Sequence, residues 1–479
     1  MSGELESKHR VKLGYAPTRR NIFSKEEAGK FKTLIEEKIK TFGADIINLD
    51  WLNNEGLLYN SLDADVVAKR FTVEGVDALF SPHCNFGTED AVARLAKKLN
   101  VPFLLWGPRD DAPLPDGCRS RDSQCGLFAT SKVLQRYGVP FTYITNTTLE
   151  DEIFERGFKN FVAAASVVKT FRNLRIGQIS TRPEEFLSVM CNEGELLERF
   201  GIEIVPIALN EIVKAVSRIE KEDKENIHET VEEIKKKVEY IGFEEEELAR
   251  MAAFKLAIKY WANNNNLSAV AVQCWYAMQE ALGIFPCFID GELSDEGLPI
   301  VCETDIHGAI TAAMVQAAGM GRTPTFFTDI TIRHPVDNNT ELLWHCGPFP
   351  YSLRKEGGKS SVSRHYLNPN PCPGVSEWEI KGGDISISRF DGMNGEYSLL
   401  MGHGYGAEGY MNRGTYVWVK FNDWPLWEEK LIYGPYNHHC VGIHSKIAPA
   451  LYEACRYIPG LKPDPVEPTE AEIRKYLRA

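Results

Sequence analysis

A chain of 479 residues is long enough for about three domains. Its composition, 43% hydrophobic and 25% charged, is that of an ordinary soluble globular protein. The net charge of −13 argues against a nucleic-acid partner, and the absence of an apolar run of roughly 20 residues argues against a membrane helix.

The first ten residues and the cysteines indicate the compartment. The chain starts with several acids and without an apolar segment, so we expect no signal peptide. Its eleven cysteines never form a Cys-x-x-Cys pair and lie scattered among apolar residues. This pattern favours reduced, buried thiols in a cytoplasmic protein over a disulfide framework or a zinc site.

Residues 1–172 alternate short apolar runs with segments of helical periodicity. Ser24, with Glu27 three residues later, has the spacing of a helix-capping box. Strands that alternate with helices of this length predict a doubly wound parallel sheet. The predicted strands are 11–16, 45–49, 76–82, 101–106 and 141–145, and the later predicted helices are 63–72, 88–99, 123–137 and 149–171.

Residues 173–318 predict a second α/β domain of the same kind. In the highly charged stretch 220–250, Ile227, Val231 and Ile234 keep a spacing of three to four, which predicts one amphipathic surface helix. The predicted strands are 174–180, 203–207, 269–273 and 298–302, and the other predicted helices are 253–264 and 308–318.

Residues 319–479 have a different texture, because Gly, Pro and Asn separate short β-branched and aromatic runs. These runs predict an antiparallel, barrel-like β-rich domain. They are 341–346, 383–389, 396–402 and 415–421. We expect a helix over 445–455, an extended surface tail over 459–468, and a turn or bulge at the glycine-rich 402–406. The predicted fold is therefore two doubly wound α/β domains followed by a β-rich domain.

Two acids end neighbouring apolar runs. Glu303 follows the run 298–302, and Asp329 follows the run 323–328. With the helix 308–318 between them, the runs predict a βαβ unit whose parallel strands end at the same edge of a sheet. Side by side there, the two carboxylates would hold a hard cation or share a proton. Alternatively, each acid caps the turn or helix that follows it.

Histidines are few, and most single histidines serve structural roles. His345 ends a predicted strand, whereas His438, His439 and His444 fall within seven residues, which favours a site. The spacing matches neither a zinc finger nor the His-Glu-x-x-His helix of a metalloprotease. Two carboxylates and one imidazole with water positions suit Mn²⁺ or Mg²⁺ better than Zn²⁺.

Four segments resemble the L-fucose isomerase/L-arabinose isomerase superfamily, and most closely its fucose isomerase-like branch. They are Val-Cys-Glu303-Thr-Asp305 before a Gly-Ala helix, Phe-Phe-Thr-Asp329-Ile, Leu-Trp-His345-Cys-Gly, and Asn437-His438-His439. The order and separation of the four segments are more specific than any one of them. The predicted domains also agree with the two α/β domains and one β-rich domain of that superfamily.

The resemblance implies a metal-dependent aldose–ketose isomerase that works through a cis-enediol. It implies Glu303, Asp329 and His438 as ligands of Mn²⁺, or of Mg²⁺ or Co²⁺. His438 directly follows the asparagine, but the His438-His439 doublet leaves the imidazole ligand open. The resemblance also implies that Glu303 and Asp329 move a proton between C1 and C2 of the sugar.

The same resemblance implies the sugar-binding residues and the assembly. Asn437 and His345 would hold sugar hydroxyls, and Trp275 would form a wall of the pocket. Arg19, His83 and Asn85 would reach the site of a neighbouring subunit, or serve only as turn and capping residues. The implied assembly is a homo-oligomer, often a hexamer, in the cytoplasm.

The substrate stays open at this point. A free sugar of the fucose or arabinose type is the main expectation. Arg19-Arg20 and Arg333-His334 introduce an anionic hexose such as sulfoquinovose as an alternative, because guanidinium groups bind sulfonates through paired hydrogen bonds. A non-catalytic sugar-binding protein on the same scaffold and a metal-assisted lyase are further alternatives. No Gly-x-Gly-x-x-Gly follows the first strand, which argues against a nicotinamide cofactor.

Overall fold

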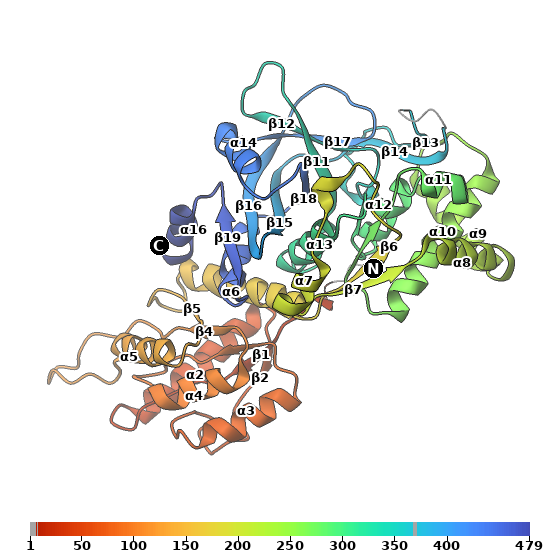
Figure 1. Cartoon of the computed structure of the whole chain (residues 1–479). Coiled ribbons are helices and arrows are strands. Elements are labelled where there is room, and N and C mark those ends of the chain that lie inside the picture. The colour runs from red at the N-terminus through yellow and green to blue at the C-terminus, as the bar shows by residue number, and fades with distance from the viewer. Residues whose placement is uncertain (1–5, 7, 367–370) are drawn as a thin grey trace. The chain divides into compact units, whose positions relative to one another are not determined.

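The computed structural model describes residue 6 and residues 8–366 and 371–479. They group into two compact units (Figure 1). One unit contains His9–Lys169, Tyr452–Pro459 and Glu470–Ala479, and the other contains mainly Thr170–Leu451 and Gly460–Thr469. The domain limits at 172 and 318 stay predictions. The expected lack of a signal peptide concerns residues that lie largely outside the described part.

The unit with residues 9–169 contains a five-stranded parallel sheet of order β2-β1-β3-β4-β5, which confirms the first doubly wound domain. As expected, the Ser24 side chain caps the first long helix by accepting from the Glu27 N–H. The strands are β1 Lys12–Tyr15, β2 Asp45–Ile47, β3 Ala78–Phe80, β4 Phe103–Leu105 and β5 Thr142–Tyr143. The helices are α2 Lys25–Thr41, α3 Asp63–Val73, α4 Glu89–Leu99, α5 Ser123–Arg136, α6 Glu152–Phe171 and the late α16 Glu470–Arg478.

Both faces of this sheet are covered by helices, as a parallel sheet requires. One buried cluster joins the sheet to α3 and α4, and the other joins it to α2 and α6. In the strand order 2-1-3-4-5, the switch point lies between β1 and β3, where doubly wound sheets bind ligands. Arg19 and His83 follow these two strands.

The other unit begins with a four-stranded parallel sheet of order β10-β9-β6-β7, which confirms the second doubly wound sheet. Its strands are β6 Arg175–Ile179, β7 Glu203–Ile207, β9 Ala269–Val272 and β10 Ile300–Val301. The helices around it are α7 Glu193–Phe200, α8 Leu209–Glu222, α9 Lys224–Lys237, α10 Glu245–Asn264, α11 Ala277–Leu282, α12 Cys287–Asp295 and α13 Ile306–Ala318.

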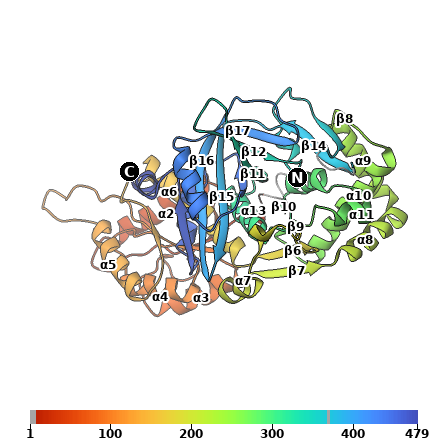
Figure 2. The ribbon, with the colours of Figure 1, turned by 45° about the horizontal axis from the view of Figure 1, so that its top comes forward.

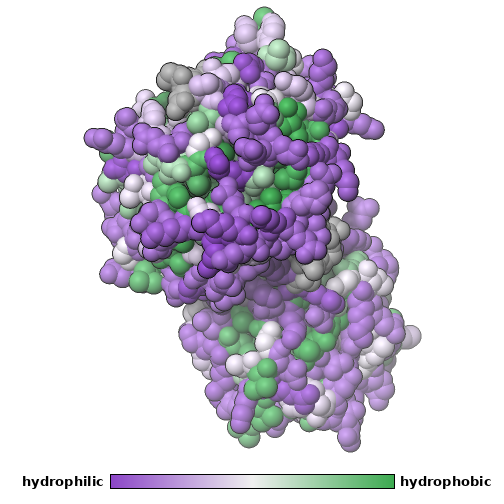
Figure 3. All heavy atoms as spheres, turned by 90° about the vertical axis from the view of Figure 1, so that its right-hand side faces the viewer, coloured by the Kyte–Doolittle hydropathy of each residue, from purple (hydrophilic) through white to green (hydrophobic). Residues whose placement is uncertain are grey.

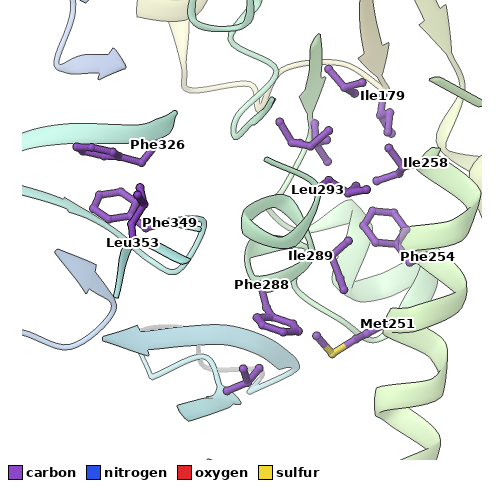
Figure 4. Close-up of a cluster of buried hydrophobic side chains, with 14 of the residues drawn as sticks. Ile179, Met251, Phe254, Ile258, Phe288, Ile289, Leu293, Phe326, Phe349 and Leu353 are labelled. Atoms are coloured by element: carbon purple, nitrogen blue, oxygen red, sulfur yellow. The ribbon is translucent and has the colours of Figure 1, made fainter. Parts of the chain in front are cut away.

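The single helix expected over 220–250 is wrong. The helix breaks at Asp223 between α8 and α9, and α9 ends at Lys237. The break lets α9 pack against both α8 and α10, so the apolar stripe of Ile227, Val231 and Ile234 is buried as its spacing indicates. Figure 4 shows the neighbouring contact, in which side chains of α10 face those of α12.

Six antiparallel strands close into a barrel in the order β16-β15-β18-β11-β12-β17, because β17 also pairs with β16. Their bounds are β11 Phe326–Arg333, β12 Thr340–His345, β15 Asp384–Met393, β16 Glu396–Ala407, β17 Thr415–Lys420 and β18 His439–Ile443. Extra strands extend this sheet (Figure 2): β8 Tyr240–Ile241, β13 Ser361–Arg364, β14 Pro373–Glu379 and β19 Leu461–Pro465. The barrel confirms the predicted β-rich architecture.

Two helices and two local corrections complete this part of the chain. The helices are α14 Trp424–Tyr433 and α15 Ala448–Cys455, and α15 agrees with the helix expected over 445–455. The tail 459–468 is extended as expected, because it contains β19, but β19 pairs in parallel with β16 and is therefore part of the sheet. The glycines of 402–406 form no turn but lie inside β16, where Gly402 packs so closely on Trp427 that a Cβ would overlap the ring.

The βαβ unit expected around α13 is also wrong. β11 lies in the barrel, antiparallel to β12 and β18, and not in the parallel sheet with β10. Helix α13 is buried at every position, because it contacts β9 and β10 on one side and β15 and β18 of the barrel on the other. An apolar helix without a polar face is typical of this sandwiched position. Helix α13 therefore joins the two sheets, and its N-terminus lies between them.

The surface agrees with the charged composition. On the face shown in Figure 3, hydrophilic side chains dominate and hydrophobic ones form small separate patches. None of the helices in the described part of the chain is long and apolar enough to cross a bilayer.

The barrel depends on close packing at Gly442, which lies opposite Phe326 in the β11–β18 ladder. A Cβ at this position would overlap the Phe326 ring. We expect Gly442→Ala to lower the free energy of unfolding by about 1–3 kcal/mol, the usual effect of overpacking a core. Gly194→Ala in α7 of the same unit is the control, because its Cβ would meet only ordinary contact at 3.4 Å. Equal thermal unfolding temperatures for the two variants would contradict this prediction.

Candidate active site

Glu303 and Asp329 approach the same imidazole from different sheets. Glu303 follows β10 of the parallel sheet, whereas Asp329 lies in β11 of the barrel, directly opposite His439 in β18. The Nε2 atom of His439 lies 3.0 Å from Glu303 Oε2 and 3.5 Å from Asp329 Oδ1. The two acids thus meet across His439, although the βαβ unit that led us to expect their proximity does not form.

The two neighbouring histidines differ in environment. His439 is fully buried, and its Nδ1 lies 2.9 Å from Asp305 Oδ2, so its two ring nitrogens have fixed surroundings. The His438 side chain is 54% exposed, and its Nε2 lies 4.0 Å from Asp329 Oδ1. Glu303, His438 and His439 each offer one ligand atom within 4.8 Å of the others.

Three buried polar atoms at this place have no hydrogen-bond partner among the described residues: Asp329 Oδ1, His439 Nε2 and His345 Nε2. His345 Nε2 lies 4.0 Å from Asp329 Oδ1, so the unpaired atoms converge. Buried polar atoms are rarely left unpaired in native proteins. A set of carboxylate oxygens and imidazole nitrogens is suited to a divalent cation such as Mn²⁺. The residues present therefore fit such an ion.

The His439 ring and the carboxylates around it shift one another's pKa. Burial favours the neutral ring of His439, but the surrounding carboxylates of Asp305, Glu303 and Asp329 raise its pKa to about 10. Burial also opposes the ionisation of Glu303, yet the nearby His439 ring brings the pKa of Glu303 below the ordinary value. Glu303 is therefore ionised at neutral pH, and carboxylates surround a centre that attracts cations.

The backbone at Glu303 is strained. Glu303 and Thr304 have φ angles of 64° and 54°, in the left-handed region that non-glycine residues rarely adopt. The Thr304 N–H donates to Val272 O at 3.1 Å, and its hydroxyl donates to Thr181 O at 3.3 Å, which holds the turn. Such strain costs on the order of 1–3 kcal/mol per residue and clusters at functional sites. Here it directs the Glu303 side chain to His439.

Trp275, Asn437 and His345 lie in the same unit. Trp275 Nε1 donates to Glu303 Oε1 at 3.2 Å, which places the indole beside the acid. The Asn437 side chain accepts from the His439 N–H at 2.9 Å and donates to Ser188 O at 3.3 Å, so it orders the start of β18. His345 Nδ1 accepts from the Cys346 N–H, which leaves Nε2 toward Asp329. Their roles toward a sugar stay predictions.

Arg19, His83 and Asn85 belong to the other unit, where each has a local partner. Arg19 Nε donates to Glu55 Oε2 at 2.6 Å, His83 Nδ1 lies 2.6 Å from Phe86 O, and Asn85 Oδ1 accepts from the Arg20 N–H at 2.8 Å. These contacts are what the turn and capping alternative expects. A contribution to a neighbouring subunit's site stays a prediction.

Sequence reasoning missed the residues behind His439. Asp305 belongs to the motif that contains Glu303, but its contact with His439 was not foreseen. Arg389, Asp391 and His307 complete the same buried group. The only available signal was a pair of charges at alternate positions, Arg389 and Asp391, in the segment 385–391, which otherwise alternates apolar residues with two serines.

Comparisons with known proteins point to sugar isomerases. Residues 14–172 match the family model described as "Fucose/sulfoquinovose isomerase, N-terminal domain". A sulfoquinovose isomerase from Alkalicoccus urumqiensis is 26% identical over 326 residues, which cover 68% of this chain and 71% of the relative. The sulfoquinovose isomerase from Priestia megaterium (strain ATCC 12872 / QMB1551) is 26% identical over 327 residues, with the same coverage.

Another relative, a sulfoquinovose isomerase from Clostridium sp. (strain MSTE9), is 25% identical and covers 64% of this chain and 70% of its own length. A solved solute-binding protein from Actinobacillus succinogenes 130z with bound D-allose is 12% identical over 65% of this chain and 92% of its own. Its TM-score is 0.18, so it carries no argument.

Taken together, these matches indicate an enzyme of the aldose–ketose isomerase class. They support the fucose isomerase-like superfamily, which the four motifs of the sequence resemble. The alternatives of a non-catalytic sugar-binding protein and of a lyase therefore lose support.

Proposed function

We propose that the chain is a metal-dependent isomerase of a sulfonated hexose of the sulfoquinovose type. The observation that carries the proposal is the convergence of Glu303, Asp329 and His439, from three separate segments, on one buried place. The sulfonated substrate rests on the names of the relatives, which favour this alternative over the neutral fucose or arabinose type.

Glu303, Asp329 and His439 would hold the divalent cation. His438 was preferred from the sequence, and the geometry gives His439 the stronger case, because its ring is buried and its Nε2 faces both acids. A bound cation supplies Lewis acidity to the carbonyl and neighbouring hydroxyl oxygens of the sugar. Mn²⁺ is the first choice, and Mg²⁺ or Co²⁺ would satisfy the same donors.

The proton transfers at C1 and C2 fall to the two carboxylates. Ionised Glu303 takes the proton from C2, which gives a cis-enediol, and returns it to C1, while Asp329 carries the hydroxyl proton from O2 to O1, so that no proton is gained or lost. Trp275 orients the Glu303 carboxylate through its N–H, which donates to Oε1. His345 Nε2, unpaired beside Asp329, is placed to hold a sugar hydroxyl.

The sulfonate preference has a direct test. We expect kcat/KM for sulfoquinovose to exceed that for D-glucose by about 10²-fold or more, because a charge-assisted contact is worth up to about 3 kcal/mol. D-glucose is the matched control, because it carries a hydroxyl where sulfoquinovose carries the sulfonate. Ketose formation is measured with saturating Mn²⁺, with L-fucose and L-arabinose in the same panel. Faster turnover of any neutral sugar would reject the sulfonated substrate but keep the isomerase.

Two arginine clusters motivated an anionic substrate, and both have partners within the chain. Arg19 is paired with Glu55, and the Arg333 guanidinium donates to Asn338 O at 2.8 and 2.6 Å. A sulfonate contact by Arg19 would therefore require it to exchange a partner, whereas the bonds to Asn338 O use only part of the five N–H donors of the exposed Arg333.

We also propose a homo-oligomer, which light scattering on the purified chain tests directly.

A further inference from the structure

A continuous series of buried ionic groups lies behind His439. His439 Nδ1 lies 2.9 Å from Asp305 Oδ2, and Arg389 binds both oxygens of Asp305, with Nη2 at 3.1 Å from Oδ1. Arg389 Nε donates to Asp391 Oδ2 at 2.9 Å, and Asp391 Oδ1 lies 2.8 Å from His307 Nδ1. We call these five residues the buried relay.

The relay is closed to solvent. His439, Asp305 and Arg389 are fully buried, and Asp391 and His307 are 6% and 2% exposed. Buried charges are costly unless they are paired and hydrogen-bonded. Arg389 contacts both oxygens of Asp305, and His439 contacts one of them, so the Asp305 carboxylate is paired within the buried group. Asp305 is therefore fixed in place.

The relay is also fixed to three elements. Asp305 caps α13 by accepting from the Gly308 N–H at 2.9 Å, while its other oxygen faces His439 in β18. Gly308 permits this approach, because a Cβ there would lie 2.8 Å from Asp305 Oδ2. Arg389 and Asp391 come from β15, which pairs with β18. A single carboxylate thus sets the position of the helix and of the imidazole.

We propose that Asp305 is a positioning residue that holds the Nδ1–H of His439 and so presents Nε2 to the cation, with Arg389 and Asp391 keeping Asp305 in place. Histidine ligands usually donate their other ring N–H to such a carboxylate, which fixes the tautomer and the ring orientation. This inference rests on the proposed metal site. It adds a function for residues that contact neither the cation nor the sugar.

A purely structural role would account for the same contacts. The ion pairs would then only fasten α13 to the barrel, and their loss would change stability but not metal affinity. Metal affinity therefore separates the two explanations. Asp305→Asn is the suitable change, because it keeps the size and the helix cap, and Arg389 retains Asp391 as its partner.

The experiment measures Mn²⁺ affinity by calorimetry on the purified full chain. We expect Asp305→Asn to weaken binding by about 10–100-fold, the usual effect of removing the outer partner of a ligand. Glu292→Gln is the matched control. It also changes a buried acid of the same unit to its amide, but Glu292 is paired with Lys237 and Lys255 and not with a residue of the buried relay. We expect this control to bind Mn²⁺ like the wild type.

Each outcome decides a different point. Unchanged Mn²⁺ affinity in folded Asp305→Asn overturns the positioning role and leaves the proposed function intact. A wild type that binds no Mn²⁺ overturns the proposed function and the positioning role with it. Should Asp305→Asn not fold, Asp391→Asn replaces it, because it changes the contacts of Asp391 with Arg389 and His307 and leaves Asp305 itself intact. A smaller but measurable loss of affinity then supports the relay, and wild-type affinity rejects it.

Discussion

Replacing Glu303 by glutamine is expected to lower kcat by about 10²–10⁴-fold, the usual contribution of a positioned acid–base group. Glutamine keeps the size of the side chain and the acceptor for the Trp275 N–H, but it cannot take a proton from carbon. It also replaces one charged ligand of the cation by a neutral amide. We therefore expect both kcat and kcat/KM to fall, as measured by ketose formation at saturating Mn²⁺.

Glu341→Gln is the control for this experiment. Glu341 is a buried acid of β12 in the same unit, but burial raises its pKa to about 7, and it contacts none of the site residues described above. Its amide should behave much like the protonated acid, so activity should change little. If Glu303→Gln keeps more than about a tenth of the wild-type kcat, less than a single acid–base group supplies, Glu303 is not the base.

Local patterns were sufficient to predict the layers of the fold. Strand and helix periods are properties of short segments, so the parallel sheets and the barrel could be anticipated. The route from β10 to β11 could not, because strand–helix–strand is also what a helix between two sheets produces. What decides between them is the second buried face of α13, which contacts β15 and β18, strands far along the chain. The sequence did contain one indication of this second contact, because α13 is apolar on all sides and has no polar face for solvent.

The candidate site shows the same division. Glu303, Asp329 and the histidine doublet were identified because acids and imidazoles at the ends of apolar runs stand out in a sequence. The choice between His438 and His439 needed the three-dimensional structure, because both rings lie near Asp329 and only burial and the contact with Glu303 favour His439. Arg389 and Asp391 were hidden because a buried ion pair looks like two isolated surface charges until its partner Asp305 is brought beside it.

We expect His439→Gln to remove Mn²⁺ binding, whereas we expect His438→Gln to keep most of it. His439 Nε2 is buried between Glu303 and Asp329, so its loss deletes a donor that no solvent-exposed group replaces. The loss of Mn²⁺ affinity should exceed the about 10–100-fold loss that follows removal of an outer partner of a ligand. His438, 54% exposed and 4.0 Å from Asp329, can be replaced by water.

Thermal unfolding with and without Mn²⁺ provides the measurement. An ion at 100 times its Kd stabilises a folded protein by about 2.7 kcal/mol, so Mn²⁺ should raise the unfolding temperature of the wild type and of His438→Gln. In His439→Gln the rise should vanish, and a chelator should no longer change the curve. The two substituted positions are adjacent in the chain. A general loss of stability would lower the unfolding temperature measured in chelator, but it would not remove the rise that Mn²⁺ causes. If only His438→Gln loses the shift, the ion is held by the exposed ring, and Asp305 then supports a histidine that is not a ligand.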